Sequence, residues 1–205
     1  MSSAEFERWN TRFSTEAYVF GTAPNAFLAS CRDLLPKAGR ALAIADGEGR
    51  NGVFLAECGL DVLSVDFSPA AQAKAQALAA ARGVAIETVT ADLLRWDWPE
   101  GAFDVVAAIF FQFLEPAERT EVFARIRRAL KPGGLLLLEG YRPEQIANGT
   151  GGPKTPDNMY TRELLEAAFG DFTDLRIEAY DAELDEGEGH KGISSVIDLV
   201  GRRPG

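Results

Sequence analysis

The sequence is poor in the residues that build metal clusters, disulfide frameworks and membrane spans. Its 205 residues include two cysteines, one histidine and two methionines, so we expect neither a disulfide framework nor a metal site. Cys31 and Cys58 fall in helical runs and are expected to be buried or half-buried thiols. The longest apolar run, residues 105–111, is far short of a membrane span, and the first residues lack a basic segment followed by an apolar core. We therefore expect a cytoplasmic protein without membrane contact.

Basic residues are also in the minority. The chain has 21 Lys and Arg against 31 Asp and Glu, a formal net charge of −10. Nucleic-acid binding requires a basic face that neutralises phosphates, so this charge argues against a nucleic-acid partner and favours a small molecule. With 46% hydrophobic and 25% charged residues, the chain has the composition of a globular protein, and its length fits one domain around one core.

Short apolar runs alternate with helical patterns along most of the chain. The expected strands are residues 41–45, 61–66, 84–89, 103–111 and 135–139, and the expected helices are 25–35, 51–58, 69–82, 116–130 and 161–169. This alternation predicts right-handed crossovers and a doubly wound, Rossmann-like α/β sheet with helices on both faces. Two last strands, 172–182 and 191–200, lie too close for a helical crossover and predict an antiparallel hairpin. The result is a seven-stranded, mostly parallel sheet.

Two connecting segments have distinctive compositions. Residues 141–160 are rich in Gly, Pro, Asn and Thr, and a loop of this length in a compact domain is either functional or poorly ordered. The acidic run 183–188 is interpreted as a solvated loop.

The most specific motif is a Gly-x-Gly-x-x-Gly loop, Gly47 to Gly52, between the first apolar run and the helix that follows it. Such a loop presents backbone N–H groups and a helix N-terminus to a cofactor. Asp66 ends the next apolar run, where an acidic side chain can accept both hydroxyls of an adenosine ribose. A tight turn and a solvated strand-end acid are the alternatives that involve no ligand.

Two further carboxylates, Asp46 and Glu48, lie in this loop. They would repel the pyrophosphate of NAD or FAD. S-adenosylmethionine has no phosphate, and its amino and sulfonium groups are cations that acidic side chains suit. The loop therefore favours S-adenosylmethionine as the cofactor.

Taken together, the motifs resemble those of class I S-adenosylmethionine-dependent methyltransferases. The family has a glycine loop after its first strand, an acid ending the second, an acid just after the third, Phe-Asp-x-Val opening the fourth and Lys-Pro-Gly-Gly before the fifth. Here these are Gly47 to Gly52, Asp66, Asp92, residues 103–106 and residues 131–134. The resemblance implies methyl transfer from S-adenosylmethionine to a small-molecule acceptor.

The N-terminal segment is similar to that of the tellurite-resistance and thiopurine methyltransferase branch. The similarity rests on Trp9, Asn10, Arg12 and Phe13, followed by Tyr18, Gly21, Pro24 and Asn25. Relatives in that branch methylate soft sulfur, selenium or tellurium nucleophiles, which implies a thiol or other chalcogen acceptor. The chain departs from the family where Ala43 replaces the usual acid and Ala45 the first glycine.

The resemblance and the spacing together assign site roles. The expected cofactor-binding residues are Arg12, Ala45, Asp46, Gly47, Glu48, Gly49, Asp66, Phe67, Ala91, Asp92, Leu93 and Phe110, and the expected acceptor-side residues are Tyr18, Phe111 and Tyr141. Asp66 would bind the ribose, Phe67 would lie near the adenine, and Asp92 would accept from its exocyclic amine. A core aromatic and a turn residue are the alternatives for Phe67 and Asp92.

Other assignments have equally plain alternatives. Trp9, Arg12 and Tyr18 either close over the methionine portion of the cofactor or belong to a terminal segment stapled to the core. Phe110, Phe111 and Phe113 either wall the acceptor pocket or form core. His190, the single histidine, is the candidate general base, with a surface histidine as the alternative.

At the level of the whole chain, we expect a single domain over 1–205 with 1–24 as an N-terminal lid. Two other functions remain open. A non-catalytic S-adenosylmethionine- or S-adenosylhomocysteine-binding protein would need the same motifs. An NAD-dependent oxidoreductase would share the glycine loop, but the chain has no Tyr-x-x-x-Lys pair. The sequence does not identify the acceptor, the oligomeric state or the pathway.

Overall fold

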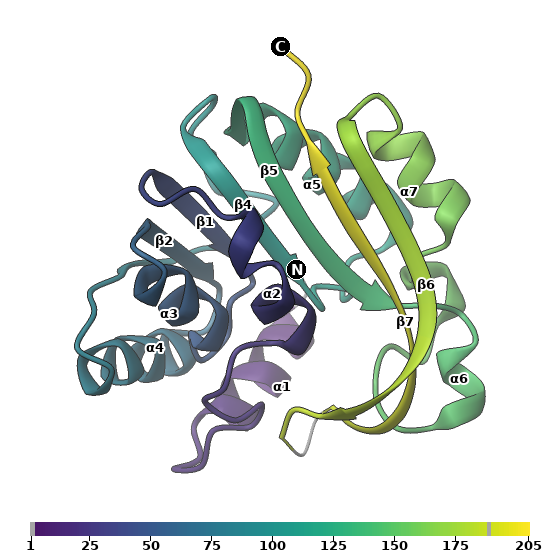
Figure 1. Ribbon diagram of the computed structural model, residues 1–205. Coiled ribbons are helices and arrows are strands. Elements are labelled where there is room, and N and C mark those ends of the chain that lie inside the picture. The colour runs from purple at the N-terminus through teal and green to yellow at the C-terminus, as the bar shows by residue number, and fades with distance from the viewer. Residues whose placement is uncertain (1–2, 188–189) are drawn as a thin grey trace.

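The computed structural model describes residues 3–187 and 190–205 and contains a seven-stranded sheet in the order β3-β2-β1-β4-β5-β7-β6 (Figure 1). The strands are β1 (Arg40–Ile44), β2 (Asp61–Asp66), β3 (Glu87–Thr90), β4 (Phe103–Ile109), β5 (Leu130–Tyr141), β6 (Thr173–Asp185) and β7 (Lys191–Arg202). The pairs among β3, β2, β1, β4 and β5 are parallel, whereas β7 is antiparallel to both β5 and β6. The predicted doubly wound sheet and its antiparallel hairpin are therefore confirmed.

Seven α-helices and two short 3-10 helices fill the connections of the described chain. They are α1 (Ser3–Phe13), α2 (Ala26–Ser30), η1 (Arg32–Leu34), α3 (Arg50–Glu57), α4 (Pro69–Ala81), α5 (Pro116–Ala129), α6 (Gln145–Asn148), η2 (Pro156–Asn158) and α7 (Arg162–Phe169). None of these helices combines the length and the apolar character that a membrane crossing requires.

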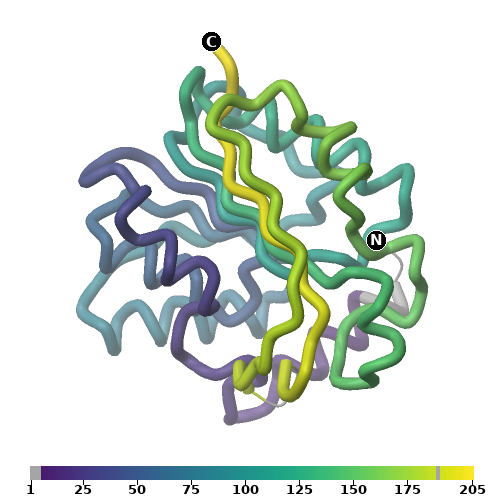
Figure 2. Tube along the Cα trace, turned by 45° about the vertical axis from the view of Figure 1, so that its right-hand side comes forward, coloured from purple at the N-terminus to yellow at the C-terminus, as the bar shows by residue number. Residues whose placement is uncertain are grey.

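Side chains of the central strands alternate strictly between two apolar layers. Leu42 of β1 and Val106 of β4 pack with α5 and α7 on one face, whereas Ala41 and Val105 pack with α2 and α3 on the other. Figures 1 and 2 show these helices on the two sides of the sheet. Because parallel strands are covered on both faces, the apolar runs are continuous in the sequence, as expected.

Several element boundaries differ from the predictions, and three of the differences have a clear local cause or content. The expected helix over 25–35 begins after its cap, Asn25, whose side chain accepts from the Leu28 amide, and it breaks into α2 and η1. The third strand is β3 rather than 84–89, because Val84 still donates to the carbonyl of Ala79 at the end of α4. The expected loop over 141–160 contains α6 and η2.

Candidate active site

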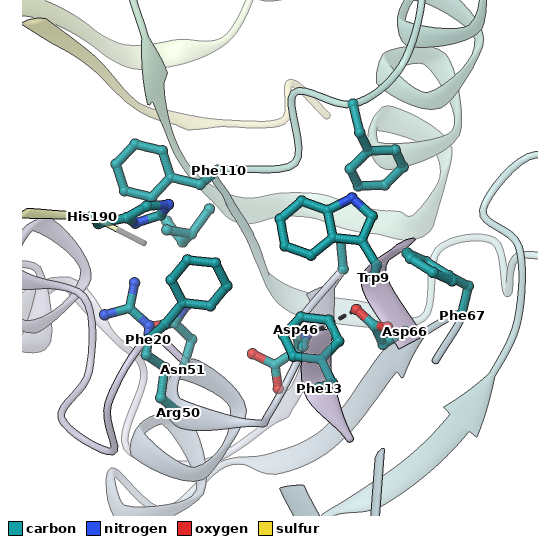
Figure 3. A pocket seen from close by; sticks show the side chains of 14 residues that line it. Trp9, Phe13, Phe20, Asp46, Arg50, Asn51, Asp66, Phe67, Phe110 and His190 are labelled. Atoms are coloured by element: carbon teal, nitrogen blue, oxygen red, sulfur yellow. Dashed lines mark hydrogen bonds between the residues drawn. The ribbon is translucent and has the colours of Figure 1, made fainter. Parts of the chain in front are cut away.

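The carboxyl ends of β1, β2 and β4 border a pocket of about 560 Å³, a volume that includes space open to solvent (Figure 3). We call it the inner pocket. In doubly wound sheets this edge is where ligands bind. The lining residues are Trp9, Phe13, Phe20, Ala45, Asp46, Gly47, Arg50, Asn51, Asp66, Phe67, Ile109, Phe110, Phe113 and His190.

The glycine loop turns the chain sharply at the end of β1. Ala45, Gly47 and Gly49 all have positive φ, at 48°, 55° and 86°. Gly49 precedes α3 and touches α4, because a Cβ there would lie 2.5 Å from the Cβ of Ala75. Ala45 adopts the left-handed conformation at the position where the family has glycine, which costs on the order of 1 to 3 kcal/mol. Gly49 therefore serves the packing of α3 against α4, and it is not among the residues lining the inner pocket.

Asp66 lies at the end of β2 and lines the inner pocket. Its Oδ2 accepts from the Gly47 amide at 2.9 Å and its Oδ1 from the Ser68 amide at 2.9 Å. Burial raises the pKa of Asp66 to about 6, while these backbone donors act in the opposite direction. Each carboxylate oxygen has a second lone pair, so the side chain is fixed in place and still able to accept from two hydroxyls.

Asp46 forms the second acidic wall of the inner pocket. Both of its oxygens accept from the Gly52 amide, at 3.1 and 3.2 Å, and Oδ2 also accepts from the Ser64 hydroxyl at 2.8 Å. Burial raises the pKa of Asp46 to about 7, with a smaller contribution from the nearby Asp66. The pocket therefore contains a carboxyl group that titrates close to neutral pH.

Helix α1 covers the inner pocket with aromatic rings. Trp9 and Phe13 stack with centroids 5.6 Å apart, and both contact the ring of Phe20. The helix is fastened to the start of α4, because the Ser68 hydroxyl at the N-cap of α4 donates to Asn10 at 2.7 Å. Figure 3 shows these rings around the space beside Asp66. These rings form an apolar wall on one side of the pocket.

A second, outer pocket adjoins the first and has a volume of about 1080 Å³, including space open to solvent. Five side chains line both pockets and form the boundary between them: Trp9, Phe20, Phe110, Phe113 and His190. The outer pocket is further lined by Arg8, Arg12, Gln112, Tyr141, Gly152, Pro153, Lys154, Thr155 and Asn158. Two ligands could therefore meet across a boundary that is mostly aromatic.

Part of the chain is similar to known methyltransferases. Residues 41–134 match the model of the methyltransferase domain family. The chain is 36% identical over 106 residues to a demethylmenaquinone methyltransferase of Thermus thermophilus. The aligned region covers 51% of this chain and 48% of that protein. Residues 41–134 are thus similar to methyltransferase domains. The chain spans about half the length, or less, of the curated relatives it matches.

Solved structures extend the likeness in fold to nearly the whole chain. Phosphoethanolamine N-methyltransferase 2 of Haemonchus contortus, in complex with S-adenosyl-L-methionine, superposes with a TM-score of 0.71 at 19% identity, over 96% of this chain and 57% of that chain. TehB from Haemophilus influenzae superposes with a TM-score of 0.66 at 15% identity, over 97% of this chain and 67% of the TehB chain. At these identities the likeness shows the fold alone.

The second loop carboxylate, Glu48, faces away from the inner pocket. It accepts from the Val19 amide at 2.7 Å and forms a 2.7 Å ion pair with Lys74 of α4. Tyr18 lies in the same contact, with its hydroxyl donating to the carbonyl of Lys74 at 3.1 Å. Glu48 and Tyr18 line neither pocket. They instead attach the segment after α1 to α4.

Phe111 also lies elsewhere than expected. Strand β4 ends at Ile109, and Phe110 takes a left-handed φ of 52°. This reversal directs the ring of Phe110 to the boundary between the pockets and buries Phe111 in the core, against Phe123 and Tyr160. The expectation that Phe111 walls the acceptor pocket is therefore wrong, and its alternative as a core residue is correct.

The residues after β3 lie beside Asp66 without lining either pocket. The Ala91 amide donates to the carbonyl of Asp66 at 2.9 Å, and Leu93 is buried in the core. Asp92 accepts from the Leu94 amide at 3.0 Å and begins a turn. Its contact with an adenine amine stays a prediction.

Beyond the end of β6, Glu186 packs against the start of α3, a contact that the sequence did not indicate. Glu186 is buried and forms a 2.7 Å ion pair with Arg50 at the start of α3. Burial opposes the charged form, yet the contacts with His190 and Arg50 lower the pKa of Glu186 to about 2. The expected solvated loop over 183–188 is therefore wrong for Glu186; Glu188 lies outside the described residues.

His190 is buried rather than at the surface. Its ring contacts Phe20 and Phe110, with centroids 4.6 and 4.3 Å away, and its Nδ1 lies 3.8 Å from Glu186. Burial lowers the pKa of His190, with Glu186 acting in the opposite direction. The imidazole is therefore neutral near pH 7 and able to accept a proton, at the boundary between the pockets.

Sequence reasoning missed Arg50 and Asn51 as pocket residues. Both occupy the variable positions of the glycine motif, which the motif itself leaves unspecified. Asn51 accepts from the Asn25 amide at 3.0 Å, so it also holds the start of α2. Arg12, in contrast, lies at the outer pocket, over the rings of Trp9 and Phe20 at 5.2 Å from each centroid.

Proposed function

We propose that this chain transfers a methyl group from S-adenosylmethionine, bound in the inner pocket, to a small nucleophile bound in the outer pocket. The observation that carries the proposal is the pair of pockets that share one aromatic boundary. A methyl group passes directly between donor and acceptor, so the two ligands must meet in line without intervening water. Residues 1–24 serve as a lid on a single domain over 1–205.

The inner pocket suits each part of the donor. Asp66 accepts from the ribose hydroxyls, and Phe67 packs against the adenine. Asp46 attracts the amino group, while the guanidinium of Arg50 meets the carboxylate. The sulfonium lies by Phe20, Phe110 and His190, where ring faces stabilise a cation. Methyl transfer then needs alignment and exclusion of water more than it needs a catalytic side chain.

Titration calorimetry tests the donor assignment. S-adenosylmethionine and S-adenosylhomocysteine should both bind, and NAD should not, because its pyrophosphate would meet the carboxylates of Asp46 and Asp66. Binding of NAD that is tighter than binding of S-adenosylhomocysteine would contradict the proposal. A methyl-transfer screen with labelled S-adenosylmethionine then separates an enzyme from a protein that only binds the cofactor.

Cofactor affinity should fall as the pH is lowered from 8 to 5.5. The amino group of the ligand favours the charged form of Asp46, whose pKa in the free protein is about 7. Below pH 7, binding must therefore release a proton from Asp46. In that range the dissociation constant of S-adenosylhomocysteine should rise about tenfold for each pH unit by which the pH is lowered. Asp66, with a pKa of about 6, adds a second step at lower pH.

Adenosine provides the matched ligand for this titration because it has the ribose but no amino acid portion. Its affinity should show the step near pH 6 and lack the step near pH 7. Asp46→Asn should remove the step near pH 7 for S-adenosylhomocysteine as well. An affinity for S-adenosylhomocysteine that stays constant between pH 6 and 8 would contradict the role given to Asp46.

For the acceptor, we propose a thiol or another soft chalcogen nucleophile, on the basis of the N-terminal resemblance. When such a nucleophile binds as a soft anion, for example a thiolate, it carries no proton to remove and needs little help from a base. His190→Gln should therefore retain most of the maximal rate with thiols. With a phenol or amine acceptor, loss of a general base should cost on the order of 10² to 10⁴ in rate.

Single-turnover assays of the wild type and of His190→Gln with thiols, phenols and amines decide between these nucleophiles. Thermal unfolding of His190→Gln serves as the control, because the imidazole is buried between aromatic rings. Activity restricted to phenols or amines and abolished in His190→Gln would exclude the soft nucleophile.

A further inference from the structure

One oxygen of Glu186 lies between two partners. Its Oε2 accepts from the guanidinium of Arg50 at 2.7 Å and lies 3.8 Å from Nδ1 of His190. The first distance is that of a hydrogen bond, and the second is too long for one. Although burial opposes the charged form, the contacts with His190 and Arg50 lower the pKa of Glu186 to about 2. The side chain is therefore a carboxylate near neutral pH, and Arg50 holds the oxygen that His190 faces.

The other oxygen of Glu186 is anchored at the start of α2. Oε1 accepts from the Ala26 amide at 2.8 Å. Nδ2 of Asn25 donates to Oε1 at 3.1 Å and to Oε2 at 3.3 Å, so it can stay bonded while the carboxylate tilts. Oε2 would need to move by about 1 Å to bring its 3.8 Å distance from Nδ1 of His190 to that of a hydrogen bond. The carboxylate can thus change partner without leaving its anchor.

The imidazole of His190 is surrounded by aromatic rings. The ring centroids of Phe20, Phe110 and Tyr141 lie 4.6, 4.3 and 5.7 Å away. Nδ1 is buried and has no hydrogen-bond partner among the described residues. A buried polar atom without a partner is costly, so such an atom calls for a physical reason. Glu186 is an acidic side chain within 4.0 Å of Nδ1, and that nitrogen can donate to Oε2 once the oxygen is released.

Arg50 connects this pair to the inner pocket. It lines that pocket, and Figure 3 shows its guanidinium on the side where His190 lies. A ligand carboxylate binds a guanidinium best through two parallel N–H···O contacts. That carboxylate would lie close to Glu186, and like charges repel strongly in a buried site. A carboxylate bound to Arg50 from the pocket therefore weakens the hold of Arg50 on Oε2.

We propose that the carboxylate of the methyl donor takes Arg50 from Glu186, and that Oε2 then accepts from the Nδ1–H of His190. This hydrogen bond fixes the tautomer of the imidazole, because the proton stays on Nδ1 and the lone pair on Nε2. Glu186 is thus a positioning residue that acts through His190, which lines both pockets. The inference rests on the proposed function, since it requires that Arg50 meets the donor carboxylate. Its consequence is that the donor itself prepares the imidazole at the boundary.

The ring nitrogens of His190 report this change directly. The chain has one histidine, so nitrogen-15 NMR of the tag-free protein shows a single imidazole. At pH 8 the ring is neutral, because burial lowers the pKa of His190. On addition of S-adenosylhomocysteine, the Nδ1 signal should shift towards that of a protonated ring nitrogen and the Nε2 signal towards that of an unprotonated one.

The matched ligand is decarboxylated S-adenosylhomocysteine, 5′-deoxy-5′-(3-aminopropylthio)adenosine. It keeps the nucleoside, the sulfur and the amino group and lacks the carboxylate. At saturation it should leave both ring signals of His190 where they are in the free protein.

Variants test the shared oxygen separately from the donor. Arg50→Met cannot donate to Oε2, so the free variant should show the ring state that the wild type reaches with S-adenosylhomocysteine. Glu186→Gln can present an amide N–H to Nδ1 of His190, so its ring should carry the proton on Nε2 and should not respond to S-adenosylhomocysteine. Glu48→Gln is the matched control, because it alters another buried carboxylate with a 2.7 Å ion pair, and it should respond as the wild type does. Thermal unfolding establishes the temperature at which all three variants are folded.

The outcomes separate this inference from the proposed function. Calorimetry first establishes that S-adenosylhomocysteine binds, and failure at this step contradicts the proposed function together with the inference. If both ligands bind and give the same ring spectrum, the donor carboxylate does not act on His190, and the inference is wrong while the proposed function stands. A free Arg50→Met protein with the ring state of the free wild type would overturn it as well, whatever the ligands do.

Discussion

Asp66→Ala should weaken binding of S-adenosylhomocysteine by roughly 1 to 3 kcal/mol, a factor of about 5 to 150 in the dissociation constant. The carboxylate is buried beside the pocket and already oriented by the amides of Gly47 and Ser68. Its removal leaves the ribose hydroxyls without their acceptors. Titration calorimetry measures the effect directly.

Asp61→Ala is the matched control, because Asp61 begins the same strand and its side chain is 80% exposed. That variant should bind S-adenosylhomocysteine as the wild type does. Thermal unfolding of both variants tests the structural alternative. A collapse of the melting temperature in Asp66→Ala with unchanged affinity would mean that Asp66 serves the fold and not the cofactor.

Arg50→Ala should destabilise the protein by about 3 to 5 kcal/mol, because it leaves the buried Glu186 without its 2.7 Å partner. For a chain of this size the melting temperature should fall by about 6 to 20 °C. Arg82→Ala is the control, since its 3.5 Å pair with Glu57 is partly exposed and should contribute less than about 1 kcal/mol.

The double variant Arg50→Met, Glu186→Leu distinguishes the loss of an ion pair from the loss of packing. It removes both charges and keeps apolar volume, so it should be markedly more stable than Arg50→Ala. Differential scanning calorimetry at one pH compares the four proteins. Equal melting temperatures for Arg50→Ala and Arg82→Ala would show that the buried ion pair contributes no more to stability than the partly exposed one.

The sheet was predictable because its signals are local. Each parallel strand is apolar on both faces, and each connecting helix shows its own period, so neighbouring residues were enough to predict the order of elements. Asp66 was predictable for the same reason: it ends an apolar run at a fixed distance from the glycine loop. Its structural environment agrees with that position, because the Gly47 amide donates to its carboxylate.

The rest of the site depends on contacts between distant segments. A loop carboxylate such as Glu48 could face the pocket or the protein, and its pairing with Lys74 is decided by how α4 packs on the glycine loop. Phe110 lies at the boundary between the pockets, whereas Phe111 lies in the core, because Phe110 takes a left-handed conformation. The burial of Glu186 and His190 follows from contacts with Arg50, Phe20 and Phe110 on distant segments, which no local periodicity encodes.

The ion pair between Arg50 and Glu186 joins residues 136 positions apart, and this separation sets an order of assembly during synthesis. At translation rates of about 5 to 20 residues per second, the glycine loop leaves the ribosome roughly 7 to 30 seconds before its partner does. Until then, Arg50 is a solvated cation and one wall of the inner pocket is missing. The nascent protein can thus form its parallel strands early, whereas a complete donor site exists only after the hairpin has folded back onto them.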